Sequence, residues 1–90
     1  MLFEWDEEKA ETNLKKHGIS FIAATAVFDD PNRVDEDSTK PEYGEVRTKT
    51  IGLIEGELII AVIHTDRQQK RRIISARRAT KNEREKYYHS

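Results

Sequence analysis

The spacing of apolar residues changes near the middle of the chain. Before residue 30, apolar side chains such as Phe21, Ala24 and Phe28 recur at helical intervals, whereas beyond Gly44 apolar and polar residues alternate. The first spacing predicts helices and the second predicts strands. The pattern therefore predicts an α+β fold, in which two N-terminal helices precede an antiparallel β-sheet meander and a C-terminal helix ends the chain.

Capping residues set the bounds of the two N-terminal helices. Asp6 has the side chain typical of an N-cap, and Gly18 supplies the left-handed residue that ends a helix, so a helix is predicted over residues 6–17. Ser20 caps a second helix, predicted over residues 21–28.

Strands fill most of the second half. Glu55-Gly56 predicts a hairpin turn, and the polar stretch 66–69 leads into the last long strand. Residues 57–65 are apolar on both parities, which is typical of a central strand covered on both faces. The predicted strands cover residues 2–5, 33–37, 46–51, 57–65 and 70–78.

Two further segments complete the outline. Residues 38–44, with Pro41 and Gly44, predict a loop. Thr80 and Glu83 have the spacing of a capping box, which predicts a final helix of about ten residues.

Composition narrows the class of protein. Ninety residues predict a single domain over 1–90, and 37% charged residues with a net charge of −1 predict a highly charged surface. The absence of cysteine excludes disulfides, thiolate metal sites and a cysteine nucleophile. The longest apolar run, Leu58 to Ile63, is too short to cross a membrane, and the first residues lack the basic region of a signal peptide. A cytoplasmic protein is expected.

The two halves of the chain carry opposite charge. Residues 1–45 contain five basic and twelve acidic residues, whereas residues 46–90 contain eleven basic and five acidic ones. The basic half has the charge density to attract a polyanion. The alternative is that the two halves neutralise one another within the fold.

Arginines dominate the last predicted strand. Regular alternation puts Arg72 and Arg78 on one face and Arg71 and Arg77 on the other. At least one of them is expected beside the core, paired with a carboxylate such as Glu4, Asp6 or Glu83, and the others are free to hold phosphate. The alternative for any single arginine is that it lies on an edge strand, where its charge prevents aggregation through the strand edge.

Other side chains offer proton transfer or stacking. His64 is expected to be exposed at the end of its strand, with a pKa near or below neutrality, as a general acid or base. His17 fits a helix cap better than a catalytic group. One of Tyr87 and Tyr88 is expected to pack on the sheet, which leaves the other to stack on a base or donate its hydroxyl.

A run of carboxylates raises the question of a metal site. The run has neither the glycine of an EF-hand loop nor a His-Glu-x-x-His motif nearby, so no metal and no cofactor are predicted. A solvated edge, or a surface for a basic partner, fits the run better. The carboxylates concerned are Asp29, Asp30, Asp35, Glu36 and Asp37.

Short motifs extend over nearly the whole chain. They are Phe3-Glu4-Trp5-Asp6 with Lys9 and Asn13; Lys16-His17-Gly18-Ile19-Ser20-Phe21 with Ala24 and Val27-Phe28; Asp30-Pro31; Thr65-Asp66-Arg67; Arg72-Ile73-Ile74-Ser75-Ala76-Arg77; and Glu83-Arg84 with Tyr87. Together these motifs are specific. On them the chain resembles the BrnT-type toxins, which are small toxins of type II toxin-antitoxin systems with a RelE-like ribonuclease fold.

The resemblance implies a function. It implies an RNA-cleaving toxin that inhibits translation without a metal, and a cognate ribbon-helix-helix antitoxin that neutralises it. Operator DNA would be bound only through the antitoxin, in a heterotetramer of two toxins and an antitoxin dimer.

Roles for individual residues follow from this chemistry. Arg67 and Arg77 are expected to hold the phosphate and its transition state, His64 to transfer a proton, and Tyr87 to donate one. The residues expected to contact RNA are Lys49, Arg72, Arg78, Arg84 and Tyr88. The competing hypotheses are a non-catalytic module that binds nucleic acid or a partner for regulation, and, last, a metal-dependent nuclease built on the acidic run.

Overall fold

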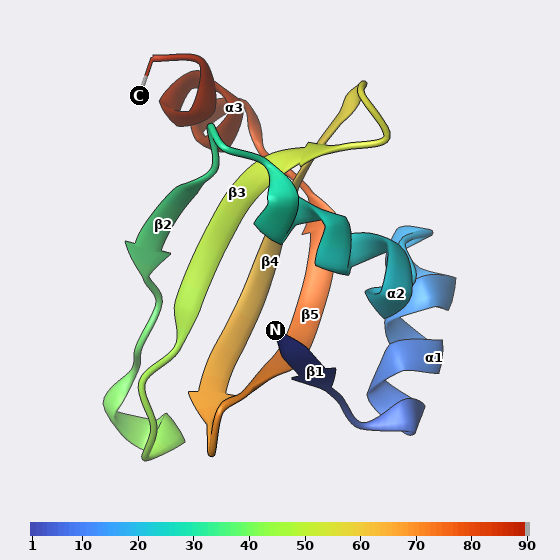
Figure 1. Cartoon of the computed structure of the whole chain (residues 1–90), viewed down its shortest axis with the longest axis vertical. Coiled ribbons are helices and arrows are strands. Elements are labelled where there is room, and N and C mark those ends of the chain that lie inside the picture. Colours follow the sequence, from blue (N-terminus) through green and yellow to red (C-terminus); the bar gives the residue numbers. More distant parts are fainter. Residues whose placement is uncertain (90) are drawn as a thin grey trace.

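A computed structural model describes residues 1–89, and in it five strands form one mixed sheet of order β1-β5-β4-β3-β2 (Figure 1). The strands are β1 (Leu2–Glu4), β2 (Val34–Asp37), β3 (Thr48–Ile54), β4 (Leu58–Arg67) and β5 (Lys70–Arg78). The helices are α1 (Glu7–His17), α2 (Phe21–Ala24) and α3 (Lys81–Tyr88), with 3₁₀ helices η1 (Thr25–Asp29) and η2 (Pro41–Tyr43).

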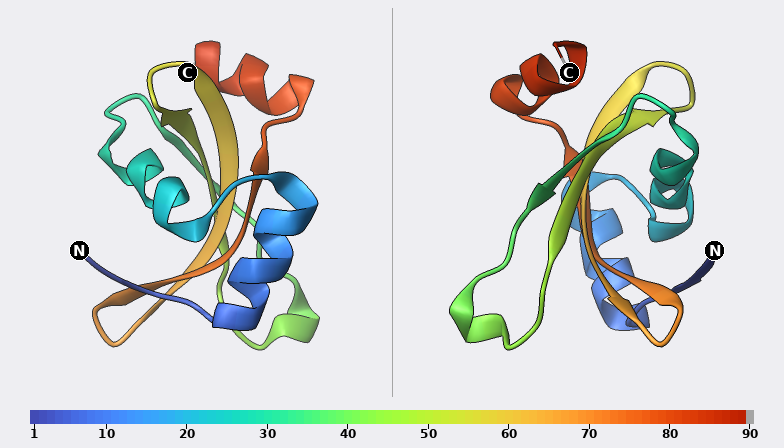
Figure 2. Two further views of the ribbon diagram at one scale, coloured as in Figure 1. Left: turned by 90° about the vertical axis from the view of Figure 1, so that its right-hand side faces the viewer. Right: turned by 60° about the vertical axis from the view of Figure 1, so that its left-hand side comes forward.

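The helices cover the two faces of the sheet unequally (Figure 2). We call the face under α1, α2 and η1 the covered face. The opposite face carries α3 at one end only, and we call it the open face. Among residues 1–89, no helix is long and apolar enough to cross a membrane.

Helix positions follow the caps read from the sequence. Asp6 accepts from two backbone N–H groups at the start of α1, and Gly18 ends it with a φ of 72°. The predicted second helix is α-helical only as far as Ala24 and continues as the 3₁₀ helix η1. Both halves of the predicted capping box form at α3.

The sheet corrects the prediction of a purely antiparallel meander. Strands β3, β4 and β5 do form consecutive antiparallel pairs, and their hairpin turns lie where expected. However, β1 pairs with β5 in parallel, so the sheet is mixed. Local pattern gives no information on this pairing, because β1 and β5 are the first and last strands along the chain and lie far apart in sequence.

One extra residue in β5 changes which side chains share a face. Ser75 lies opposite Ile63, yet Ile73 lies opposite the next residue of β4, His64. Ile74 is therefore a β-bulge, and the alternation of β5 shifts by one beyond it.

The bulge overturns the predicted arrangement of the arginines. Arg72 and Arg77 pair with Thr65 and Ala61, which share one face of β4, so both arginines belong to the open face. Arg71 instead belongs to the covered face, where its guanidinium lies 4.7 Å from the ring centroid of Phe28.

Most of the core lies between the sheet and the helices of the covered face. Phe21, Val27, Ile60 and Ile73 are among its fully buried members. Gly52 allows this packing, because a Cβ there would lie 2.5 Å from the side chain of Val27. A smaller apolar cluster packs beneath α3 on the open face.

The β4–β5 turn is strained, which gives a first prediction. Gln68 and Gln69 both have left-handed backbones, with φ values of 47° and 70°. Because Asn-Gly adopts this turn without strain, replacing the pair by Gln68→Asn and Gln69→Gly is expected to raise the free energy of unfolding by about 1 kcal/mol. Urea unfolding measures the change, and an unchanged or lower stability would contradict the assigned turn.

Candidate active site

Four cationic side chains occupy the part of the open face that α3 leaves uncovered. They come from three adjacent strands and remain partly accessible, with Arg77 at 35% exposure and Arg72 at 29%. Their strand positions place them on the same side as Ile63 and Ser75, which are half-buried. The four are Lys49, Arg67, Arg72 and Arg77.

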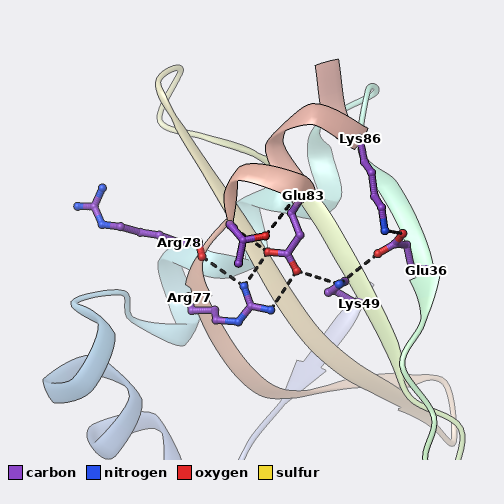
Figure 3. A network of polar contacts seen from close by, with 7 residues as sticks. Glu36, Lys49, Arg77, Arg78, Glu83 and Lys86 are labelled. Atoms are coloured by element: carbon purple, nitrogen blue, oxygen red, sulfur yellow. Dashed lines mark hydrogen bonds and ion pairs between the residues drawn. The ribbon is translucent and has the colours of Figure 1, made fainter. Parts of the chain in front are cut away.

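A buried carboxylate organises one end of this group (Figure 3). Glu83 of α3 accepts two hydrogen bonds from the Arg77 guanidinium, at 2.7 and 3.0 Å, and lies 2.8 Å from Lys49 Nζ. It also accepts from the backbone N–H of Thr80, so one carboxylate both caps α3 and neutralises two cations.

This environment fixes the charge of each partner. The Arg77 guanidinium, together with Lys49 and the Thr80 N–H, holds the pKa of Glu83 well below its usual range against the effect of burial. Glu83 in turn raises the pKa values of Arg77 and Lys49. All three groups are charged at neutral pH, and Glu83 is not a proton acceptor there.

The network continues across the sheet to its edge. Lys49 lies 3.1 Å from a carboxylate oxygen of Glu36 in β2, and Lys86 of α3 lies 2.6 Å from the other oxygen. Hydrogen bonding by Lys86 is the main cause that lowers the pKa of Glu36. α3 is therefore held to the sheet by ion pairs with both β2 and β5.

A second group of side chains lies at the other end of the open face. Arg67 donates to Glu45 at 3.0 Å, and Arg47 donates to the other oxygen of Glu45 at 3.1 Å. The Arg47 guanidinium also lies 3.7 Å from the ring centroid of Tyr43. Next to them is a hollow of about 370 Å³, which Thr65 and Arg67 help to line.

The two arginines expected to share one phosphate are far apart. Arg77 lies opposite Ala61, six residues before Arg67 in β4. At ~3.3 Å per residue, their backbones are about 20 Å apart. The structure does not bring these two guanidinium groups together, since one pairs with Glu45 and the other with Glu83. Arg72, opposite Thr65 and 3.8 Å from Glu4, lies between them.

His64 lies in the interior and not at an exposed strand end. β4 continues to Arg67, so the imidazole is on the covered face, where it is only 3% exposed and meets the Phe28 ring edge-on at 4.9 Å. Burial, followed by the charge of Arg71, lowers the pKa of His64 to about 4. The low pKa agrees with expectation, but the expected exposure is wrong.

The hydrogen bonds of His64 define its tautomer. The Thr50 hydroxyl donates to Asp35 Oδ1 at 2.6 Å, so its oxygen accepts from His64 Nε2–H, 2.7 Å away. Nδ1 then carries no proton, and it is buried without a hydrogen-bond partner among the described residues. This relay ties β2, β3 and β4 together beneath the helices.

One of the two C-terminal tyrosines packs on the sheet, as predicted, and the other is exposed. Tyr87 packs on the apolar cluster beneath α3, and its hydroxyl donates to Asp30 Oδ2 at 2.7 Å. That bond, with burial, raises the pKa of Tyr87 to about 12, so the phenol keeps its proton. Tyr88 is exposed and lies edge-on to Tyr87.

Two of the predicted RNA contacts lie away from the group on the open face. The Arg78 side chain points away from the Glu83 network, although its carbonyl accepts from Arg77 (Figure 3). Arg84 in α3 donates to the carbonyl of Ala79.

The acidic run forms contacts within the protein. Asp35 and Asp30 accept from Thr50 and Tyr87, and Glu36 pairs with two lysines. Within residues 1–89, no three His, Asp or Glu side chains are grouped as metal ligands would be.

Sequence reasoning missed two residues of this face. Tyr43 and Arg47 flank Glu45, and they were read only as part of the loop over residues 38–44 and of the strand over residues 46–51. An aromatic residue close to an arginine, where the basic half of the chain begins, was the available signal, because bases stack on both kinds of side chain.

Comparisons with known proteins agree with this architecture. Residues 5–83 match the family model described as ribonuclease toxin, BrnT, of type II toxin-antitoxin system. Among solved structures, the chain is similar to the 1.1 Å crystal structure of the Brucella abortus ribonuclease toxin, BrnT. The two are 32% identical, with a TM-score of 0.69, and the match covers 90% of this chain and 100% of that one. No curated protein matches.

The chain has a small mixed sheet with α1, α2 and η1 on one face and paired cations beside α3 on the other. Together with these matches, this architecture defines a ribonuclease toxin of a type II toxin-antitoxin system. The chain belongs to the BrnT toxin family. Membership implies a cognate antitoxin as partner.

The buried imidazole predicts how stability depends on pH. Because the folded pKa of His64 is about 4 against 6.5 unfolded, the unfolded chain binds more protons between these values, and stability falls as the pH falls. The free energy of unfolding is expected to drop by about 2 kcal/mol from pH 7 to pH 5. His64→Gln, which keeps an N–H for Thr50, should abolish most of that drop in urea titrations. An equal drop in the variant would contradict the assignment.

Glu83 predicts a second stability effect. Glu83→Gln keeps the shape of the side chain but leaves Arg77 and Lys49 without their shared carboxylate. Because the carboxylate is buried and its partners are partly solvated, a loss of about 2 kcal/mol in unfolding free energy is expected. Glu85→Gln, an exposed change on the same helix, is the control and should leave the urea midpoint unchanged. Equal midpoints for the two variants would refute the role given to Glu83.

Proposed function

We propose that this toxin cleaves RNA without a metal cofactor, on the uncovered part of the open face, and that a ribbon-helix-helix antitoxin neutralises it. The observation that supports the location is the shared face of Arg72 and Arg77, with Lys49 beside them on β3 and Arg67 at the end of the row. Guanidinium groups with exposed nitrogen atoms bind phosphate through two parallel hydrogen bonds.

The chemistry needs little beyond position and charge. The 2′-hydroxyl of one nucleotide attacks its own 3′-phosphate, so that an O2′–P bond forms and the P–O5′ bond breaks. The proton leaves O2′ to a base, and the 5′-oxygen takes one as it departs, which gives a cyclic phosphate and a 5′-hydroxyl end. Cations around the phosphate stabilise the charge that develops in the transition state.

Arg72 and Arg77 are the groups proposed to hold the reacting phosphate, with Lys49 of β3 as a third cation. Each now pairs with a carboxylate, namely Glu4 or Glu83. Phosphate would replace part of this pairing, since a guanidinium has five donors and Glu83 engages only two nitrogens of Arg77.

The second group extends the proposed site. Arg67 and Arg47 would hold a neighbouring phosphate, and the stacked pair of Arg47 and Tyr43 offers a plane against which a base can lie. Tyr88, exposed on α3, is a further stacking surface at the opposite end.

His64 and Tyr87 are proposed to act indirectly. His64 holds β2, β3 and β4 in register through Thr50, and Tyr87 fixes α3 through Asp30. Both are positioning residues for the cations. Proton transfer at the phosphate then falls to water or to a carboxylate of the open face.

The competing function is a non-catalytic module that binds nucleic acid on the same face. The carboxylate paired with every cation supports it, because such pairs weaken phosphate binding. The two functions differ in whether RNA is cut.

The proposal is tested with Arg72→Gln and Arg77→Gln combined. RNA cleavage is expected to fall by about 100-fold or more, because two charged contacts to the transition state are lost, while the antitoxin still binds. Arg78→Gln is the matched control, because the Arg78 side chain points away from the Glu83 network, and its rate of RNA cleavage should stay within about twofold of wild type. Cleavage should persist in EDTA. Wild-type protein that leaves RNA intact, with and without ribosomes, would leave the binding module as the answer.

The proposed partner has its own test. The small protein encoded next to the toxin gene is expected to restore growth and to form a complex of two toxins with an antitoxin dimer, read as mass by light scattering. Operator DNA should bind the complex and not the free toxin. A partner without DNA binding would contradict the ribbon-helix-helix assignment.

A further inference from the structure

On the far side of the sheet from the basic open face, α1 and α2 lie next to one another (Figure 2). A hollow of about 180 Å³ runs between them. The Trp5 ring meets Phe21 edge-on at 6.0 Å to form its floor. The walls of the hollow are mainly apolar.

Two large apolar side chains border this hollow and remain accessible. Leu14 of α1 is 49% exposed and Ile22 of α2 is 72% exposed. Single exposed apolar residues are common on protein surfaces. Here two of them border one concave site with an aromatic floor, which is typical of a surface that takes an apolar side chain from a partner.

The charge of the rim limits the choice of partner. Glu7 and Glu11, one turn apart on α1, line the same hollow, and no Lys or Arg is among its lining residues. A polyanion such as RNA is repelled there. A two-fold dimer through this surface would bring the carboxylates of two copies together, which opposes self-association.

We propose that this α1–α2 groove is a docking site for an amphipathic helix of the antitoxin, with an apolar face flanked by Lys or Arg. An apolar anchor would enter beside Ile22 and Leu14, and the basic residues would pair with Glu7 and Glu11. The inference rests on the proposed antitoxin, since it names where that partner is bound. The groove lies on the opposite side of the sheet from the face proposed to bind RNA. An antitoxin helix in the groove therefore holds the toxin without itself covering the proposed RNA site.

Two surface variants test the groove. Ile22→Lys and Glu11→Lys each place a cation where a basic partner would bind. Each should weaken the affinity for the protein encoded next to the toxin gene by about 10- to 100-fold, measured by calorimetry with the full-length chains. Both variants should cleave RNA at the wild-type rate. Cells that express either variant should stop growing, and co-expression of the antitoxin should no longer restore their growth.

Matched controls separate the groove from general effects. Glu57→Lys, in the β3–β4 turn, makes the same charge change as Glu11→Lys away from the groove and should bind like wild type. Ile22→Leu should also keep wild-type affinity.

The outcomes are distinct. Wild-type affinity in both lysine variants would overturn the docking site. A wild-type toxin that dimerises on its own, and does so less after Ile22→Lys, would overturn it in favour of a second copy. If the wild-type chain binds the partner but cuts no RNA, the proposed nuclease fails while the groove is still decided by the lysine variants.

Discussion

The single residue inserted into β5 at Ile74 is the constraint on which the two faces of this protein depend. It lets Ile73 and Ala76 both point into the core, although they are three positions apart, and it sends Arg72 and Arg77 to the same side. Asn13 of α1 holds this segment, because its side chain donates to the Ala76 carbonyl and accepts from the Ala76 N–H. An amide of α1 thus completes the hydrogen bonding of a strand edge beyond the reach of β1.

Charge on the open face is almost fully matched. Glu83, Glu36, Glu45 and Glu4 each lie against a cation, so the basic second half of the chain presents far less free charge than its composition indicates. The matching carboxylates come mostly from the acidic first half. The interpretation that the two halves neutralise one another and the interpretation of a phosphate-binding surface therefore both describe this face.

Features that depend on neighbouring residues could be predicted from the sequence. The cap at Asp6, the left-handed Gly18 and the capping box of Thr80 and Glu83 all follow from local chemistry. The sequence also predicted that one strand arginine would pair with a carboxylate, but not that the pair would be Arg77 and Glu83. The parallel pairing of β1 could not be predicted, nor could the burial of His64, because both depend on contacts between distant segments. The bulge at Ile74 has no signature in the sequence, and it exchanges the faces of Arg77 and Arg78 relative to the prediction.

Glu83 couples the anchoring of α3 to the binding of anions on the open face. The same carboxylate begins the helix and neutralises Arg77 and Lys49, so any anion that competes for those cations also weakens the anchoring of the helix. Reciprocity requires the reverse: a contact that clamps α3 onto the sheet lowers the affinity of the face for phosphate by the same factor. A protein partner that bound only α3, and held it against the sheet, would thus reduce nucleic-acid binding without covering any arginine.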